Sequence, residues 1–295
     1  MKKKLIIKEL VIGVTLLFIL SGILTVNAHE NKILNPIRGE TLYVGGTGPG
    51  NYSTIWEAVI DANNGDTVFV YDYSSPYYEH VAIYNQINLI GENKDTTVID
   101  GNGTGNVLTV TSNWVTISGF TIQNGVNGIY LDNRMNTTIS GNIIKDHALD
   151  GILFYSSCDY NTVSGNTVSN NGETGIKFSS FSEYNIISEN LISNNLNGTS
   201  LAAYAYGEIT GNSFEDNTDY GLVLNLWCNE NKIHFNNFIS NGIDAKFITS
   251  VMNSWSFNYW NRPHILPKPI FGRIAIFPWV NFDWRPLLTP HVIPE

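Results

Sequence analysis

Hydrophobic and polar positions alternate between Ser118 and Ser240 in units that recur every 22 to 24 residues. A glycine opens each unit, and apolar residues mostly occupy the first and third positions after it, with a variable residue between them. This period of two predicts a short strand with one buried face. Two more apolar columns follow in each unit, separated by turns of Gly, Asn and Ser. The opening glycines are Gly128, Gly151, Gly175, Gly198 and Gly221, and the columns begin at Ile129, Ile139 and Ile144.

Units of this length leave no room for an ordinary helix beside their strands. Each unit is therefore expected to form one coil, and parallel stacking of successive coils at about 4.8 Å places like residues over like. The apolar columns then build a continuous core that no single unit could bury alone. The pattern predicts an all-β fold, a parallel β-helix solenoid over residues 41–260.

An asparagine recurs just after the second strand of each unit. Asparagine tolerates the left-handed backbone conformation found in turns. Stacked side-chain amides can also hydrogen-bond to one another and to the turn backbone. We expect a structural ladder of Asn142, Asn166, Asn190, Asn212 and Asn236, with a second, partial ladder of Asn161, Asn185 and Asn231.

The segments on either side of the repeat differ from it in composition. Ser53 or Thr54 can N-cap a short helix that runs through Ala62, which predicts an N-terminal cap over residues 41–66. Seven of the ten prolines and four of the seven tryptophans lie between Trp255 and Glu295. Because proline at this density forbids further coils, residues 255–295 are expected to form an irregular C-terminal cap rich in Pro and Trp.

The first residues have the pattern of a targeting segment. Four lysines precede an apolar run from Val11 to Val26, and a small-residue motif ends at Ala28. We predict a signal peptide over residues 1–28, cleaved after Ala28, followed by a linker over residues 29–40. The alternative is an uncleaved membrane anchor, although the run is shorter than the ~20 residues that span a bilayer. The mature protein is expected to be secreted or at the cell surface, and it meets a membrane only if this segment remains.

The chain has 295 residues, a formal net charge of −10 and only 14% charged residues. One elongated solenoid, expected to be a monomer, fits this composition better than two globular domains. Without residues 1–28 the negative charge is larger still, which argues against a nucleic-acid partner.

Two cysteines and four glycosylation sequons complete the composition. Cys158 and Cys228 each follow an opening glycine by seven residues, in coils three apart, so roughly 14 Å separates them at the strand spacing. A disulfide tolerates at most ~7 Å between Cα atoms, so we predict two free, buried thiols. The candidate glycosylation sites, all in predicted turns or loops, are Asn51, Asn102, Asn136 and Asn197.

Several motifs resemble the right-handed parallel β-helix family, and NosD-like proteins of its carbohydrate-binding and sugar-hydrolase (pectin-lyase-like) branch in particular. The motifs are the Gly-Ile-x-Leu/Phe starts, the Ile-Ser-Gly-Asn elements and the stretch from Val115 to Ile122. The resemblance covers roughly residues 41–260. It implies a right-handed solenoid with a short N-terminal capping helix, and it implies no particular activity, because the repeated residues are those that build coils.

Candidate catalytic and metal-binding residues do not cluster in the sequence. Glycosidic cleavage needs two carboxyl groups at ~5–9.5 Å, whereas the only adjacent acidic pair, Glu215 and Asp216, would point to opposite faces of a strand. The histidines are dispersed, and the densest group, His147 with Asp146 and Asp150, is equally well explained as a solvated loop. We therefore predict no catalytic residues, no metal site and no cofactor.

Aromatic residues on the coils favour a binding function, because aromatic faces stack on sugar rings. We predict a non-catalytic protein that binds polysaccharide or envelope glycans. One alternative is a polysaccharide lyase or glycoside hydrolase with an unrecognised site, and another is a NosD-like accessory protein in metal-cofactor maturation. Shielding of turns and packing of the cap also explain these aromatics. The candidate glycan contacts are Tyr130, Tyr155, Tyr184, Trp255, Tyr259 and Trp260.

Overall fold

The structure is a computed structural model that describes residues 39–293. The predicted signal peptide and almost all of the predicted linker lie outside this range. The described part is built of short strands, and its only α-helix is α2 (Ile55–Asp61). No helix among residues 39–293 is long and apolar enough to cross a membrane.

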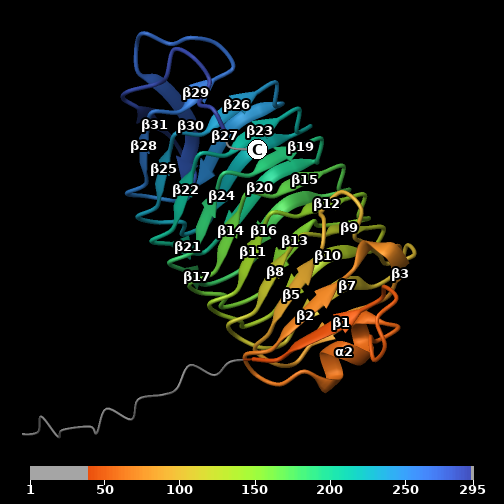
Figure 1. Cartoon of the computed structure of the whole chain (residues 1–295). Coiled ribbons are helices and arrows are strands. Elements are labelled where there is room, and N and C mark those ends of the chain that lie inside the picture. Colours follow the sequence, from red (N-terminus) through yellow and green to blue (C-terminus); the bar gives the residue numbers. More distant parts are fainter. Residues whose placement is uncertain (1–38, 294–295) are drawn as a thin grey trace, which may run out of the picture. The chain divides into compact units, whose positions relative to one another are not determined.

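The strands of successive coils stack in parallel, from α2 at one end to the last strands at the other (Figure 1). They form three rows. The first row contains β1 (Thr41–Val44), β2 (Thr67–Val70), β5 (Asn88–Gly91), β8 (Thr116–Ser118), β11 (Thr138–Ser140), β14 (Thr162–Ser164), β18 (Ile186–Ser188), β22 (Glu208–Thr210), β25 (Lys232–His234) and β28 (Ser254–Ser256).

The other two rows complete each coil. The second row contains β4 (Val81–Ile83), β7 (Asn106–Val110), β10 (Asn127–Leu131), β13 (Ile152–Phe154), β16 (Thr174–Phe178), β20 (Asn197–Ala202), β24 (Tyr220–Asn225) and β27 (Ile243–Ile248). The third row contains β3 (Tyr77–Tyr78), β6 (Val98–Asp100), β9 (Thr121–Gln123), β12 (Ile143–Lys145), β15 (Thr167–Ser169), β19 (Leu191–Ser193), β23 (Ser213–Glu215), β26 (Asn237–Ile239) and β29 (Tyr259–Trp260). Smaller elements are η1 (Asp72–Ser74), β17 (Ser182–Glu183) and β21 (Tyr204–Ala205).

The register places like residues over like. Ile139 pairs with Val163, which pairs with Ile187, and all three side chains are fully buried. Parallel strands buried on their inner face build one core along the stack. This arrangement confirms the predicted parallel β-helix.

Helix α2 covers the first coil end. Thr54 is its N-cap, and the Thr54 hydroxyl oxygen accepts a hydrogen bond from the Glu57 backbone N–H at 3.2 Å. The Glu79 carboxylate accepts the N–H groups of Ile55 and Trp56, both at 2.9 Å. These bonds satisfy donors that a helix N-terminus otherwise leaves unpaired. One apolar face of α2 packs on the core. The helix therefore shields the first coil from water.

The opposite end is more regular than the expected irregular cap. After β29, strands β30 (Lys268–Ile274) and β31 (Phe277–Asp283) form an antiparallel hairpin. Pro269 lies in β30 and Pro278 in β31, and proline is tolerated in strands of this kind at a sheet edge. The hairpin joins the parallel rows through the pairs Phe247–Gly272 and Trp255–Asp283.

A buried asparagine ladder runs along the stack. The side-chain N–H of each member donates to the Oδ1 of the next, from Asn142 to Asn166 at 3.1 Å and onward coil by coil. Asn258 extends the ladder by one coil, and the Asp283 carboxylate of the hairpin ends it at 3.0 Å. Its predicted members are Asn142, Asn166, Asn190, Asn212 and Asn236, all 1% exposed or less.

The two thiols lie in the core. Cys158 and Cys228 are free and fully buried. Both backbone N–H groups donate to serine hydroxyls of the next coil, Ser182 and Ser250, so the cysteines occupy equivalent places.

Candidate functional site

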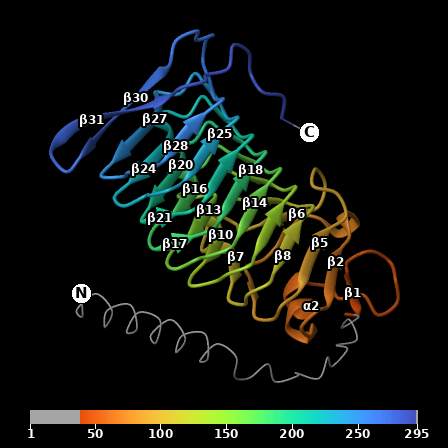
Figure 2. The same ribbon diagram turned by 90° about the vertical axis from the view of Figure 1, so that its left-hand side faces the viewer.

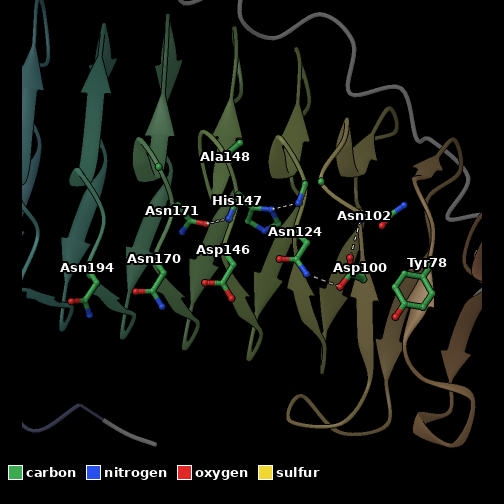
Figure 3. Close-up of a pocket in the computed structure, with 13 residues that line it drawn as sticks. Tyr78, Asp100, Asn102, Asn124, Asp146, His147, Ala148, Asn170, Asn171 and Asn194 are labelled. Carbon is green, nitrogen blue, oxygen red and sulfur yellow. Dashed lines mark hydrogen bonds between the residues drawn. The ribbon is translucent and has the colours of Figure 1, made fainter.

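A polar groove of about 920 Å³ crosses five coils where the strands of the third row end (Figure 3). Amide and carboxylate side chains line it, and Figure 3 shows one from each coil side by side on the same edge of the coils. The groove row consists of Asp100, Asn124, Asp146, Asn170 and Asn194.

The local backbone explains why asparagine and aspartate occupy this row. Asn124, Asp146, Asn170 and Asn194 have φ angles of 55°, 59°, 57° and 56°. Asn and Asp adopt this left-handed region more readily than other non-glycine residues. The turn therefore selects the residue type and directs each polar side chain into the groove.

Asp100 is the most strongly held member of the groove row. Its carboxylate accepts hydrogen bonds from Gln123 Nε2 at 2.8 Å, from Asn124 Nδ2 at 2.7 Å and from the Asn102 backbone N–H at 2.8 Å. Burial opposes ionisation, but these three donors lower the pKa of Asp100 below its usual value. Asp100 is thus a charged, fixed acceptor.

His147 lies behind the groove row and is 2% exposed. Its Nδ1 accepts the Gly125 backbone N–H at 3.0 Å, so Nε2 carries the proton and donates to the Ile122 carbonyl at 3.1 Å. Burial lowers the pKa of His147 to about 4. A neutral imidazole with both nitrogens engaged has no free lone pair for a metal ion.

His147 begins another ladder of buried side chains, which was not predicted. Its backbone N–H donates to Asn171 Oδ1 at 3.2 Å, and the ladder continues from asparagine to asparagine. The spacing of 24, 24, 22 and 24 residues was visible in the sequence. The members after His147 are Asn171, Asn195, Asn217 and Asn241.

The groove contains no evident acid–base pair. Its two carboxylates, Asp100 and Asp146, belong to coils two apart, which is roughly 10 Å at the strand spacing and at the upper limit of the range for glycosidic cleavage. No lysine or arginine is among the described residues that line the groove.

A separate ion-pair cluster surrounds Lys177 of β16 and was not predicted. Lys177 Nζ contacts Asp150 Oδ2 at 3.0 Å and Glu173 Oε2 at 3.3 Å. Burial raises the pKa of Asp150, while the two carboxylates outweigh burial and raise the pKa of Lys177. The lysine is paired with two carboxylates, so we interpret this cluster as structural.

The predicted tyrosine contacts lie in different settings. Tyr155 is 54% exposed, and the Tyr130 ring, half-buried, lies 6.2 Å from it. Tyr184 stacks between Tyr160 and Tyr206 with 5.1 Å between ring centroids on both sides. Because neighbouring rings cover both faces of Tyr184, it presents only its edge and hydroxyl to a ligand.

The predicted tryptophan contacts are buried, which corrects the interpretation of this segment. Trp255 and Trp260 are 3% and 1% exposed, and Tyr259 is half-buried. Trp260 stacks on Phe238 at 4.5 Å and donates its indole N–H to Asp283 Oδ2 at 3.1 Å. The two tryptophans close the core, where no glycan can reach them.

The four sequons are not all in loops. Asn102 is exposed in a turn beside the groove, and Asn51 and Asn136 are half-buried outside strands. Asn197, expected in a turn, is the first residue of β20.

Stacked parallel coils with a helical cap define the chain as a parallel β-helix protein. Residues 59–270 match the family described as "Periplasmic copper-binding protein (NosD)", and the chain belongs to this family. No curated protein matches it.

Two solved structures share the fold. The alginate lyase from Paenibacillus sp. str. FPU-7 has 15% identity and a TM-score of 0.54, over 76% of this chain and 88% of that one. The enzymatically active domain of Bacteriophage CBA120 tailspike protein 2 has 15% identity and a TM-score of 0.60. The match covers 77% of this chain but only 39% of the tailspike chain.

The family description names copper, so the donor set can be tested against that ion. Copper sites favour clustered His, Cys and Met ligands. Among residues 39–293, no group of three or more His, Cys, Asp or Glu side chains is placed to hold one metal ion. Both nitrogens of His147 are engaged, and burial raises the pKa of Cys158 and raises that of Cys228 to about 11. The described residues do not fit a copper site.

Proposed function

We propose that this protein works outside the cytoplasm, secreted or at the cell surface, and binds polysaccharide or envelope glycans in the groove without cleaving them. The observation that carries the proposal is the groove row itself, which offers one hydrogen-bonding side chain per coil over five coils. Carboxamides donate and accept, and carboxylates accept, so the row complements sugar hydroxyls, which do both.

The regular spacing of the row suits a linear polymer. The four members from Asn124 to Asn194 follow strands in register and are separated by about the strand spacing of 4.8 Å, so consecutive sugar units can meet consecutive side chains. The residues that follow three members of the row, His147, Asn171 and Asn195, are hydrogen-bonded into a buried ladder. The ladder holds the turns of the row in place. A preorganised surface loses little conformational entropy on binding.

The charge of the groove favours neutral or amino-sugar glycans over polyuronates. Asp100 and Asp146 are acidic, His147 is neutral, and no described lining residue is basic. Residues 39–260 contain 22 acidic residues against six lysines and arginines. Like charge disfavours a polyanionic ligand.

A glycan array that includes neutral, amino-sugar and uronate polymers tests the proposal. We expect binding to neutral or amino-sugar polymers. Parallel assays for reducing sugar and for unsaturated uronate are expected to show no turnover. Robust turnover that is abolished by substituting one acidic residue would overturn the non-catalytic assignment.

A further inference from the structure

The β30–β31 hairpin and the residues beside it expose several large apolar side chains. Ile276 at its tip is 83% exposed, and Phe277 and Trp279 beside it are 67% and 53% exposed. Figure 2 shows the hairpin extending past the strands of the last coils. Contiguous exposed apolar surface marks an interaction site. Exposed apolar residues just outside the hairpin are Ile265, Leu266, Trp284 and Leu288.

The exposed aromatic residues lie on both faces of the hairpin. Side chains alternate between faces along a strand, so Phe277 and Trp279 share one face and Phe282 lies on the other. Phe271 pairs with Val280, which places Phe271 on the face of Phe282, and these two rings are 66% and 39% exposed. A rigid partner protein would bury one face, whereas a fluid apolar phase surrounds both faces and the tip.

The charge of this end is opposite to that of the coils. Residues 261–293 contain four basic residues and one acidic residue. The acidic one, Asp283, is fully buried in the ladder, whereas Arg273 is exposed next to the hairpin tip. Basic residues beside an apolar insertion are attracted to anionic lipid headgroups. The remaining basic residues are Arg262, Lys268 and Arg285.

We propose that the hairpin docks this protein on an anionic lipid bilayer, with Ile276, Phe277 and Trp279 inserted into the headgroup region and Arg273 against the lipid phosphates. Tryptophan is enriched at that depth of membranes because its ring is amphipathic.

The test uses the full chain. A fluorescent probe is placed on the hairpin itself, so that its signal reports on the hairpin and not on membrane binding by residues 1–38. An environment-sensitive fluorophore is attached through Ala275→Cys at the exposed tip, and through Glu183→Cys on the exposed side of β17 as a control. Cys158 and Cys228 are buried with raised thiol pKa, so they react poorly. Vesicles of phosphatidylcholine, with or without phosphatidylglycerol, are titrated in.

We expect a blue shift at the tip probe only, with tighter binding to vesicles containing phosphatidylglycerol and weaker binding in high salt. The variant Ile276→Ser, Phe277→Ser, Trp279→Ser should lower the affinity reported by the tip probe by at least about tenfold. The matched variant Phe181→Ser, Leu226→Ser, Trp227→Ser removes apolar side chains of similar exposure from the coils and should leave it unchanged.

An unshifted tip probe, or equal losses in the two triple variants, would overturn the proposal. Sedimentation analysis without lipid tests whether the hairpin instead binds a second copy of the chain. A dimer that the hairpin variant dissociates, together with an unshifted tip probe, would assign the hairpin to a second copy of the chain instead.

Discussion

The side-chain amide of Asn190 donates to Asn212 Oδ1 in the next coil at 2.9 Å, while Asn190 Oδ1 accepts both the backbone and the side-chain N–H of Asn166 at 3.0 Å. The same amide donates to the carbonyls of Val163 and Ser188, both at 2.9 Å. One buried side chain thus serves three coils. The ladder satisfies polar backbone groups at a corner where the strands are too short to do so.

Replacing Asn190 with alanine should therefore destabilise the solenoid strongly. The change leaves the Asn166 backbone N–H without its acceptor in the core and removes one donor from the Val163 carbonyl, which we expect to cost about 3 kcal/mol. The urea midpoint of unfolding measures the loss. Asn194→Gly is the control, because Asn194 is exposed and glycine adopts its positive φ without strain. Equal shifts in the two midpoints would contradict a structural role for the ladder.

The period of the repeat was sufficient to predict the coils, because strand pairing converts a spacing of 22 to 24 residues into vertical columns. The column from Ile139 to Ile233 pairs in the predicted register. The ladder behind His147 has the same spacing and was missed, because its first member is not an asparagine.

Other features depend on contacts that spacing does not contain. Asp283 ends the main ladder from the hairpin, 25 residues beyond Asn258 and outside the repeat. For Trp260 the sequence leaves a glycan contact and cap packing both open, since nothing in its sequence environment shows that Phe238 and Asp283 enclose it. The groove likewise depends on which side chains a turn directs outward. Proline content indicates an irregular end, but two of these prolines, Pro269 and Pro278, lie in the strands of a regular hairpin.

His147 should make stability depend on pH. Its folded pKa of about 4 lies below the usual 6.5, so the unfolded chain takes up the proton first as the pH falls. Its contribution is present above pH 6.5 and lost as the pH falls toward 4, by about 2 kcal/mol between pH 7 and pH 5.

His147→Asn is the diagnostic variant, because asparagine occupies the equivalent place in the following coils. The variant should keep the wild-type free energy of unfolding at pH 7. Between pH 7 and pH 5 its free energy of unfolding should fall much less than that of the wild type. Chemical denaturation at the two pH values measures this. An unaltered pH dependence in the variant would show that another group is responsible.

Lys177→Met should lower the free energy of unfolding, because it leaves the buried Asp150 carboxylate without a counter-charge. Asp150 has a side chain only 2% exposed and relies on Lys177 for its counter-charge. Removing one partner of a buried pair is expected to cost about 3 kcal/mol at pH 7. The cost should shrink toward pH 5, as Asp150, with its pKa already raised, takes up a proton.

The matched control is Lys145→Met, because Lys145 pairs with Asp146 at 3.4 Å on the surface. Exposed pairs contribute less than about 1 kcal/mol, so this variant should unfold near the wild-type midpoint. A Lys177 variant that is no less stable than the Lys145 variant would refute the role given to the buried pair.

Copper binding is expected to be weak in residues 39–293, since their donors do not converge. Titration of the purified protein with cuprous and cupric ions should show no sub-micromolar site. His29 lies outside the described residues and becomes the first residue if the chain is cleaved after Ala28 as predicted. It is replaced by alanine in a parallel sample so that an N-terminal histidine does not add to the measured copper binding. Stoichiometric sub-micromolar binding in that sample would instead support the role named in the family description.

The groove row is tested most directly by calorimetry with the best glycan from the array. The variant Asn170→Gly, Asn194→Gly removes two side chains of the row and keeps the positive φ angles. The control Asn133→Gly, Asn136→Gly makes the same change at positive-φ turns away from the groove. The account predicts at least about tenfold weaker binding for the groove variant alone, since it loses two sets of hydrogen bonds. Equal affinities for the two variants would place glycan binding elsewhere or exclude it.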